Sequence, residues 1–577
     1  MRLICHYTGR ILSQPFGGGG AMTDFTREEI RSQLNMQGFD PPEPEFTEVV
    51  YRINALIEGL KKLDDLDVYH TEPWPVMPYR GLPQRSAGQG SLASGGAAEP
   101  HDPNIAFMTI REQANLIKSG KLSPVELTQT YLDRIDRYDS KLHAFNLVLR
   151  DEALAAAKAA EVEIASGKYR GPMHGIPMGV KDQFDIKGHL NTGGCDAYDD
   201  NIAREDSTII ARFREAGGII MGTLATHEFH MGGTLEFFNQ QTPRNPWDLD
   251  KSPAGSSAGS GSSVAAGLLS GAMGGDTGGS IRGPASVNGI TGLRPSWGRL
   301  SRQGIFTLAW ELDTAGPLAR SAEDTAIMLQ AIAGYDPKDP TTSQVPVPDY
   351  SQSLTGDIKD LRIGVLEQMM GDEVKPETRS LVQRAIDVLK DLGAKVEPVS
   401  IPLIERMHGV HTAICDGQAA SYHRGHLRAR YMAYDYNTRV RLLVGCLIPA
   451  GLQTLAGRAR ALMGHTMLET FETYDVLVGA TGQGPADPIV TESAITSREA
   501  AQTAVMARSG GTGSFSMAGA AAISIPAGFT PSGMPVGWHL GTRPMDEETL
   551  FRVCHAYQLA TDHHQKHPPM GVTEFGA

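Results

Sequence analysis

The chain has 577 residues, of which 41% are hydrophobic and 20% charged, a composition that allows a globular protein to bury a large core. Its formal net charge is −14 and its basic residues are scattered, which argues against a phosphate-binding surface, so we expect no nucleic-acid partner. No apolar run is long enough to cross a bilayer, and we expect a soluble protein without membrane contact.

The cysteines indicate the compartment. Their number is odd, and their spacing fits neither a disulfide framework nor a metal site. We therefore expect free thiols, a cytoplasmic location, and no metal or other cofactor. The five are Cys5, Cys195, Cys415, Cys446 and Cys554.

Residues 1–84 are predicted to form an N-terminal extension. The first 22 residues lack the sustained apolar core of a secretory signal, and either Met1 or Met22 starts the chain. Apolar residues recur at helical spacing over residues 45–69, which predicts an amphipathic helix. Its apolar face either packs on the protein's own body, the commoner case, or mediates dimerisation. A homodimer is the expectation from base rates alone.

Residues 85–103 are rich in Gly, Ser, Ala and Pro, the composition of an exposed linker. We place the domain boundary there and expect residues 104–577 to form the main domain. Near its start, Ser123 is predicted to cap a helix, because Pro124 suits the first helical position and Glu126 follows three residues after the cap.

Strand and helix signals alternate in the second half of the chain. A strand over 362–366, a helix over 377–392 and a strand over 395–401 predict a βαβ unit. The alternation returns with a strand over 536–540 and a helix over 546–559. The predicted fold class is therefore α/β.

Residues 252–299 have an unusual density of Gly, Ser and Ala, with no charge until Asp276. Glycine permits close backbone approach and positive φ, so such a segment suits a site built from main-chain amides. A flexible linker is the alternative. Val264, Leu268 and Met273 recur at near-helical spacing, however, which favours a buried helix.

Two motif matches mislead. Ser257 lies in a G-x-S-x-G pattern, but that nucleophile turn must follow a buried strand, and a polar segment precedes it here. His227 and His230 lack the i, i+4 spacing of a helical zinc pair and are better explained as structural histidines. The glycine runs also lack the G-K-[ST] ending of a phosphate loop, so ATP is not implied.

Three motifs, in this order, resemble those of the amidase signature hydrolases. The string GIPMGVKD occupies residues 175–182, AGSSAG occupies residues 254–259 where the family has GGSSGG, and GGSIR occupies residues 278–282. Ser256 and Ser280 are 24 residues apart, which is the family's usual spacing.

The resemblance extends from about residue 108 to residue 561 and implies a mixed central β-sheet covered by helices on both faces. Residues 104–577 would then be the catalytic domain. Residues 407–463, rich in apolar and aromatic side chains, are a candidate wall of the substrate pocket. Ordinary helix packing explains any single one of these residues at least as well. They are Tyr422, Tyr431, Tyr434, Tyr436, Leu442, Leu443, Leu447 and Ile448.

The resemblance also implies a reaction. Burial would keep Lys181 neutral, so that it draws the proton of Ser256, which takes the proton of Ser280 as that hydroxyl attacks a carbonyl carbon. Ser256 would follow a cis peptide bond. The relay then runs backwards to protonate the leaving nitrogen, and water repeats the cycle on the acyl enzyme.

The groups around these side chains have expected roles as well. Ser257, Asp276 and Arg282 are expected to support the site rather than react, because a carboxylate beside the lysine would restore its charge. The family's candidate donors to the oxyanion are the main-chain N–H groups of Thr277, Gly278, Gly279 and Ser280.

We therefore expect an amidase that cleaves the C–N bond of aryl or alkyl carboxylic amides, with carbamates, urethanes and esters as further candidates. One alternative is an amidotransferase-type subunit that releases ammonia from glutamine, although the chain has no basic run that would face tRNA. The other is a non-catalytic binding protein on the same fold, against which the intact Lys181, Ser256 and Ser280 argue. The motifs do not encode which amide is the natural substrate.

Overall fold

Eleven strands in the described part of the chain form one mixed β-sheet, in the order β1-β3-β2-β4-β6-β5-β10-β11-β9-β7-β8. The computed structural model describes residues 24–63, 66, 68, 71, 104–231, 242–407, 409–490, 493, 495–507 and 511–569. The strands are β1 (Phe145–Val148), β2 (Pro177–Lys181), β3 (Ile219–Leu224), β4 (Gly271–Asp276), β5 (Thr291–Arg294), β6 (Thr314–Ala319), β7 (Arg362–Leu366), β8 (Lys395–Val399), β9 (Val476–Ala480), β10 (Ala521–Phe529) and β11 (Pro535–Thr542).

Parallel and antiparallel pairs alternate in blocks. Strand β2 runs parallel to β3 and β4, and β7 runs parallel to β8 and β9, whereas the other pairs are antiparallel. The mixed α/β sheet expected from the sequence is therefore confirmed.

Helices cover both faces of this sheet. Successive residues of a strand point to opposite faces. On β11, the Cα of Gly537 lies against Ser286 of α8, while the ring of the next residue, Trp538, packs 5.0 Å from that of Tyr557 on α17. The helices are α1 (Arg27–Met36), α2 (Glu43–Lys61), α3 (Ile110–Lys118), α4 (Pro124–Leu142), α5 (Arg150–Ala165), α6 (Thr208–Glu215), α7 (Ala258–Ala265), α8 (Arg282–Asn288), α9 (Ala322–Ile332), α10 (Pro376–Asp391), α11 (Leu403–Arg406), α12 (Val410–Ala429), α13 (Tyr436–Leu447), α14 (Ala450–Thr473), α15 (Arg498–Ala507), α16 (Gly511–Met517) and α17 (Glu547–Ala560).

Several local predictions are confirmed within one or two residues. The Ser123 hydroxyl accepts the N–H groups of Val125 and Glu126 at the start of α4. The predicted βαβ unit is β7-α10-β8, with the two strands paired in parallel. The strand and helix expected near the end of the chain are β11 and α17.

The buried helix expected within residues 252–299 is shorter than its apolar pattern suggested. Helix α7 contains Val264 but ends at Ala265, and Met273 lies on β4. The pattern spans two elements because α7 and β4 are both buried along their whole length, so apolar residues continue across the turn that joins them.

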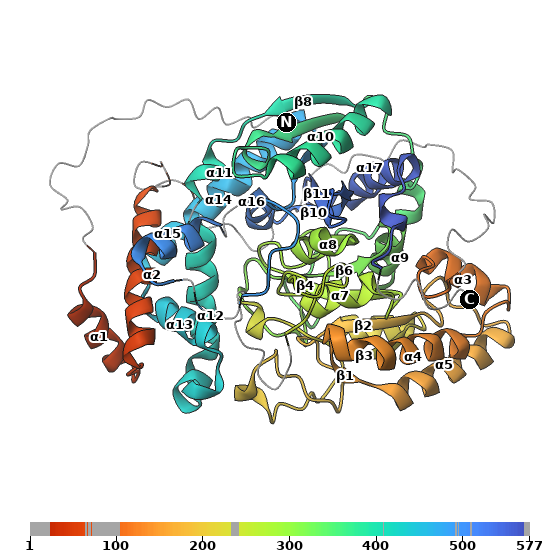
Figure 1. Ribbon diagram of the computed structural model, residues 1–577, viewed down its shortest axis with the longest axis horizontal. Coiled ribbons are helices and arrows are strands. Elements are labelled where there is room, and N and C mark those ends of the chain that lie inside the picture. The colour runs from red at the N-terminus through yellow and green to blue at the C-terminus, as the bar shows by residue number, and fades with distance from the viewer. Residues whose placement is uncertain are drawn as a thin grey trace.

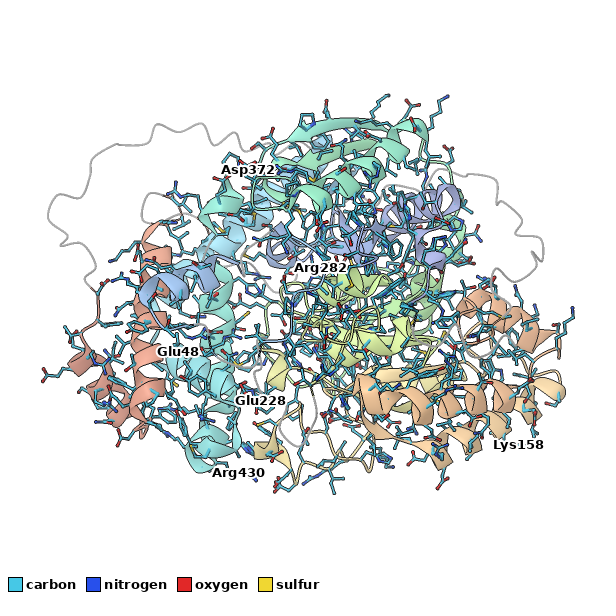
Figure 2. All side chains as sticks on the ribbon, viewed as in Figure 1. Glu48, Lys158, Glu228, Arg282, Asp372 and Arg430 are labelled. Atoms are coloured by element: carbon cyan, nitrogen blue, oxygen red, sulfur yellow. The ribbon has the colours of Figure 1, made fainter. Side chains whose placement is uncertain are left out.

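A second apolar cluster joins the N-terminal helices to helices far along the chain. We call the assembly of α1, α2 and α11–α15 the helical lobe (residues 24–63, 403–473 and 495–507). Figure 1 shows α1, α2, α12, α13 and α15 side by side at the left, with the sheet and helices α3, α4, α5, α7, α8 and α9 to their right. In Figure 2, Glu48 lies on the lobe and Arg282 near the centre of the molecule.

Helix α2 is the helix predicted over 45–69, but it ends at Lys61. The sequence that follows Lys61, KLDDLD, contains three aspartates, and acidic residues at the C-terminus of a helix oppose the helix dipole. Buried Glu45 on α2 pairs with Arg439 at 2.5 Å. Residues 1–23, with both candidate start methionines, and the predicted linker 85–103 lie outside the described residues.

Among the described residues, no single helix has the length and apolar character to span a membrane. Helices α13 and α14 together meet the criteria of length and composition, but they bend by 99° where they join. The four described cysteines, all but Cys5, are free thiols.

Candidate active site

Lys181 is the last residue of β2, a strand buried along its whole length. Its side chain is fully buried, and its Nζ lies 2.7 Å from the hydroxyl of Ser256. Burial lowers the pKa of Lys181 to about 7, although Asp276 and Asp313 act in the opposite direction. The amine can therefore be neutral near pH 7, as a base must be.

Ser256 precedes α7, and its hydroxyl is buried. The Gly255–Ser256 peptide bond is cis, as the resemblance implied. A Cβ on Gly255 would come within 2.2 Å of the His227 ring, so only glycine fits between that imidazole and the peptide. The neighbouring Ser257 is fully buried and exchanges hydrogen bonds with the backbone of Gly275, which fits a supporting role and not that of an exposed nucleophile.

Ser280 lies in the connection between β4 and α8, which we call the DTGGSIR loop (residues 276–282). Unlike Lys181 and Ser256, it is only half-buried, so it is the most accessible residue of the three. Its carbonyl oxygen accepts the N–H of Ser257 at 3.3 Å. This bond ties the two serine-bearing segments together.

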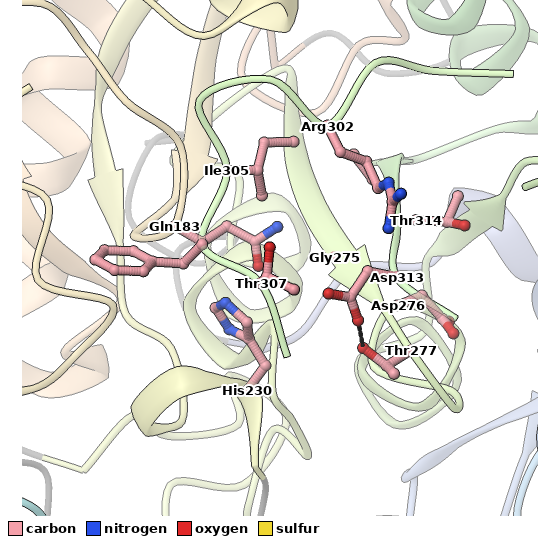
Figure 3. A pocket seen from close by; sticks show the side chains of 12 residues that line it. Gln183, His230, Gly275, Asp276, Thr277, Arg302, Ile305, Thr307, Asp313 and Thr314 are labelled. Atoms are coloured by element: carbon pink, nitrogen blue, oxygen red, sulfur yellow. Dashed lines mark hydrogen bonds between the residues drawn. The ribbon is translucent and has the colours of Figure 1, made fainter. Parts of the chain in front are cut away.

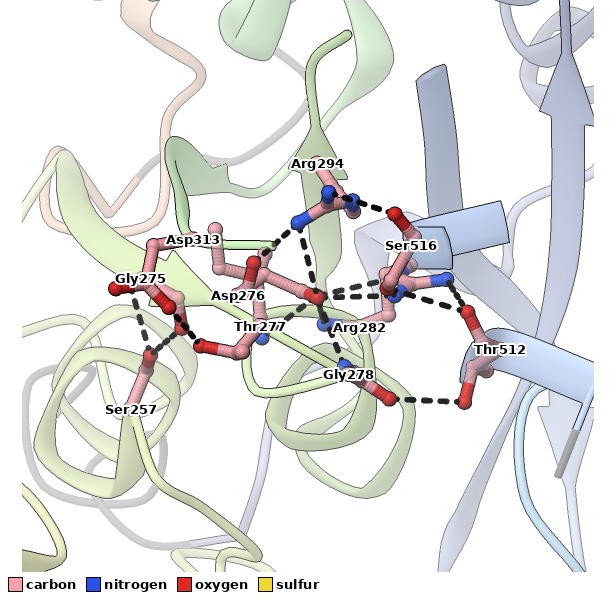
Figure 4. A network of polar contacts seen from close by, with 12 residues as sticks. Ser257, Gly275, Asp276, Thr277, Gly278, Arg282, Arg294, Asp313, Thr512 and Ser516 are labelled. Carbon is pink, nitrogen blue, oxygen red and sulfur yellow. Dashed lines mark hydrogen bonds and ion pairs between the residues drawn. The ribbon is translucent and has the colours of Figure 1, made fainter. Parts of the chain in front are cut away.

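Asp276 holds the DTGGSIR loop from within. Its carboxylate accepts the main-chain N–H of Gly279 at 2.8 Å and of Ile281 at 3.1 Å, and it pairs with Arg282 at 2.9 Å (Figure 4). Both charged side chains are fully buried. Burial alone would raise the pKa of Asp276, but the guanidinium groups of Arg282 and Arg294 keep it well below its ordinary value. The contacts of Asp276 and Arg282 thus hold the loop in shape.

Arg282 extends the network to the far side of the loop. Its guanidinium donates to the carbonyl of Thr512 on α16, to the hydroxyl of Ser516 and to Nε2 of His539, each at 2.8 Å. Burial keeps the pKa of His539 well below its ordinary value, consistent with Nε2 acting as an acceptor. Figure 4 shows how these contacts anchor the loop to α16.

The four predicted oxyanion donors are not equivalent. The N–H of Gly279 already donates to Asp276, so this member of the predicted set is committed elsewhere. The N–H groups of Thr277, Gly278 and Ser280 have no acceptor among the described residues. The structure therefore leaves three candidate donors.

A small cavity of about 20 Å³, close to the volume that one water needs, adjoins the loop. Figure 3 shows His230 and Gln183 on one side of it and Asp313 and Thr277 on the other. The Thr277 hydroxyl donates to Asp313 at 2.7 Å. Burial keeps the pKa of His230 well below its ordinary value, so the imidazole is neutral. No group of three or more potential metal ligands occurs in the described part of the chain.

Sequence reasoning missed two residues that reach the DTGGSIR loop. His411 on α12 approaches the carbonyl of Thr277, with Nε2 at 3.4 Å, and the hydroxyl of Thr512 on α16 donates to the carbonyl of Gly278 at 3.3 Å. Each is more than 130 positions from the loop in sequence, and neither lies in a motif. No signal in a single sequence could have identified them.

The candidate pocket wall at 407–463 stays a prediction, and several of its side chains have partners inside the protein. Tyr434, Leu442 and Leu443 are fully buried in the apolar cluster of the helical lobe. Tyr431 and Tyr436 donate to the carboxylates of Glu45 and Glu48 on α2. Tyr431 and Tyr436 therefore contact α2, while the ring of Tyr434 packs near those of Phe229 and His423.

Comparisons with known proteins find similar chains in sequence and in structure. The sequence model described as Amidase matches residues 126–551. A protein named Amidase from Pseudomonas putida is 37% identical over 81% of this chain and 99% of its own length. A glutamyl-tRNA(Gln) amidotransferase subunit from Geobacter metallireducens is 35% identical over 79% of this chain and 98% of its own. The native peptide amidase from Stenotrophomonas maltophilia superposes with a TM-score of 0.68 at 29% identity, covering 80% of this chain and 98% of that structure.

Proposed function

The chain belongs to the amidase family, and on that premise we propose that it hydrolyses small carboxylic amides through an acyl-enzyme on Ser280, with Ser256 and Lys181 as the proton relay. The observation that carries this proposal is the 2.7 Å contact between the fully buried amine of Lys181 and the hydroxyl of Ser256. A buried lysine whose pKa lies near 7 is a base matched to neutral pH.

The proposed reaction balances without a cofactor. The Ser280 oxygen bonds to the carbonyl carbon while its proton passes to Ser256, whose own proton passes to Lys181. The tetrahedral intermediate collapses, the C–N bond breaks, and the proton returns through Ser256 to the leaving nitrogen. Water then attacks the ester on Ser280 by the same relay and releases a carboxylic acid.

Fluorophosphonate labelling tests the nucleophile. We expect the purified chain to hydrolyse a simple anilide and to lose that activity in step with covalent labelling. Peptide mapping should place the label on Ser280. Ser257→Ala leaves the proposed relay intact and serves as the matched control for a neighbouring serine. Labelling at any other serine contradicts the assignment.

The similarity to amidotransferase subunits supports a second candidate, the release of ammonia from glutamine. The two proposals differ in their requirements, because a subunit of that kind is named for work with glutamyl-tRNA. Turnover of anilides by the chain alone, with no detectable glutamate formed from glutamine, supports the independent amidase. The reverse result supports the alternative.

We place carbamates, urethanes and esters as secondary substrates. The proposed relay delivers a proton to the leaving atom, which an amine needs more than a phenol or alcohol does. One acyl group presented as an anilide, a carbamate and an ester, assayed at equal concentrations, ranks these classes. A carbamate hydrolysed at least about tenfold faster than the anilide would shift the assignment to a urethanase.

A further inference from the structure

The peptide units of the DTGGSIR loop differ in how many of their ends are held by hydrogen bonds. A peptide unit is planar, so the carbonyl of one residue and the N–H of the next are oriented together. The unit joining Gly278 to Gly279 is held at both ends, by the Thr512 hydroxyl on its oxygen and by Asp276 on its N–H. The unit joining Ser280 to Ile281 is held by the N–H of Ser257 and again by Asp276.

Three units differ, because only their oxygen ends are held. In the unit joining Asp276 to Thr277, the carbonyl accepts from the Arg294 guanidinium. The unit joining Gly279 to Ser280 has its carbonyl bonded to the N–H of Gly283 at 2.7 Å. The unit joining Thr277 to Gly278 has its carbonyl 3.4 Å from Nε2 of His411. In all three units the N–H has no acceptor among the described residues. These are the N–H groups that a developing oxyanion could use.

His411, which contacts the carbonyl of Thr277, lies on a helix and not on the central sheet. The residue lies in the first turn of α12 in the helical lobe, and only 9% of it is exposed. Its ring also packs on Gly278, since a Cβ built there would lie 2.3 Å from Nε2. The Cys415 sulfur, one turn later on α12, is 3.7 Å from both ring nitrogens and backs the imidazole.

We infer that His411 is a positioning residue for the oxyanion hole. Because a carbonyl oxygen can only accept, Nε2 carries the proton in its contact with Thr277. That bond fixes the plane of the Thr277–Gly278 peptide and polarises its N–H, since hydrogen bonds at the two ends of a peptide strengthen each other. The inference rests on the proposed function, because it assigns a role in stabilising the tetrahedral intermediate on Ser280.

A pair of near-isosteric variants tests this inference. His411→Met removes the donor, and His411→Gln keeps one on a side chain of similar length. We expect His411→Met to lower kcat for an anilide by about 10- to 100-fold, somewhat less than the loss of an oxyanion donor itself, with KM changed less than about threefold. His411→Gln should recover kcat to within about fivefold of wild type.

A transition-state probe separates positioning from general packing. Phenylboronic acid forms a tetrahedral adduct on a serine hydroxyl, so its inhibition constant should rise in His411→Met by the same factor by which kcat/KM falls. His423→Leu is the matched control, because it removes another buried imidazole from α12 whose partner is Tyr198 and not the loop. We expect it to leave the boronic acid affinity unchanged.

Three results would overturn the inference: an unchanged kcat in His411→Met, a loss confined to KM, or the same loss in His411→Gln. If His411→Met does not fold, as judged by its melting temperature, His411→Leu supplies the variant without a donor. The wild-type chain tests the proposed function separately. If it neither hydrolyses the anilide nor reacts with the fluorophosphonate, the proposed function itself is wrong.

Discussion

The DTGGSIR loop is held together mainly by polar and charged contacts, whereas the helical lobe is held together mainly by apolar packing. In the loop, Asp276 and Arg282 are fully shielded from water, and each makes several hydrogen bonds to backbone and side chains. In the lobe, apolar side chains form most of the interior and surround a few buried ion pairs such as Glu45 with Arg439. Other ion pairs, such as Arg498 with Asp24, lie at its edge, 33% and 42% exposed. The loop is thus fixed in shape, and substitutions there should change chemistry, whereas substitutions at the lobe's edge should change only stability.

The largest effect is expected at Lys181. Lys181→Met removes the base but keeps an unbranched side chain of similar length in a fully buried site. We expect kcat/KM for an anilide to fall about 10⁴-fold, as when a member of a coupled catalytic group is lost. The melting temperature should hold or rise, because a desolvated amine is no longer buried. A variant that keeps a tenth of wild-type activity would show that Lys181 is not the base.

Gly278→Ala should have the next largest effect. The new Cβ would lie 2.3 Å from the His411 ring, so the loop or α12 must move. We expect kcat to fall about 100-fold, the size of a lost oxyanion donor. Gly283→Ala is the matched control in the adjacent turn, because a Cβ there meets nothing within 4 Å, and its kcat should stay within about twofold of wild type. Equal losses in the two variants would mean that the loop is not fixed in shape.

The pH dependence of activity should follow Lys181. The amine acts as a base only when neutral, and burial lowers its pKa to about 7. We therefore expect kcat/KM to be level above about pH 8 and to fall about tenfold per pH unit below pH 7. A rate profile on a neutral anilide measures this directly. An apparent pKa near that of a solvated lysine would place the amine in water.

The smallest effect is expected at the edge of the helical lobe. Arg498→Met breaks the pairs with Asp24 and Glu58, all three side chains being at least a third exposed. We expect the free energy of unfolding to fall by about 0.5 kcal/mol, a decrease that salt should diminish. Urea unfolding measures the loss of stability, and kcat measured on the same preparation shows whether catalysis is unchanged. A kcat reduced tenfold would show that the edge of the lobe communicates with the loop.

The sequence predicted the catalytic motifs better than it predicted the helical lobe. The contact of Lys181 with Ser256 and the half-exposed position of Ser280 agree with roles carried over from three short motifs, because glycines and serines at fixed spacing allow few backbone paths. The predicted wall at 407–463 had no such constraint. Its tyrosines and leucines suit either a substrate or a neighbouring helix, and only the folded chain shows α2 beside them. His411 was invisible for a further reason, since its partner Thr277 is 134 positions away.

The docking of α2 has a practical consequence for shortened forms of this protein. A truncation starting at residue 104 would retain the entire family match at 126–551. It would also remove the Glu45 carboxylate that pairs with Arg439. The apolar side of α12 and α13 would become exposed, and such a surface is prone to aggregation. We therefore expect the shortest version that expresses well to include α1 and α2, which lie outside the family match.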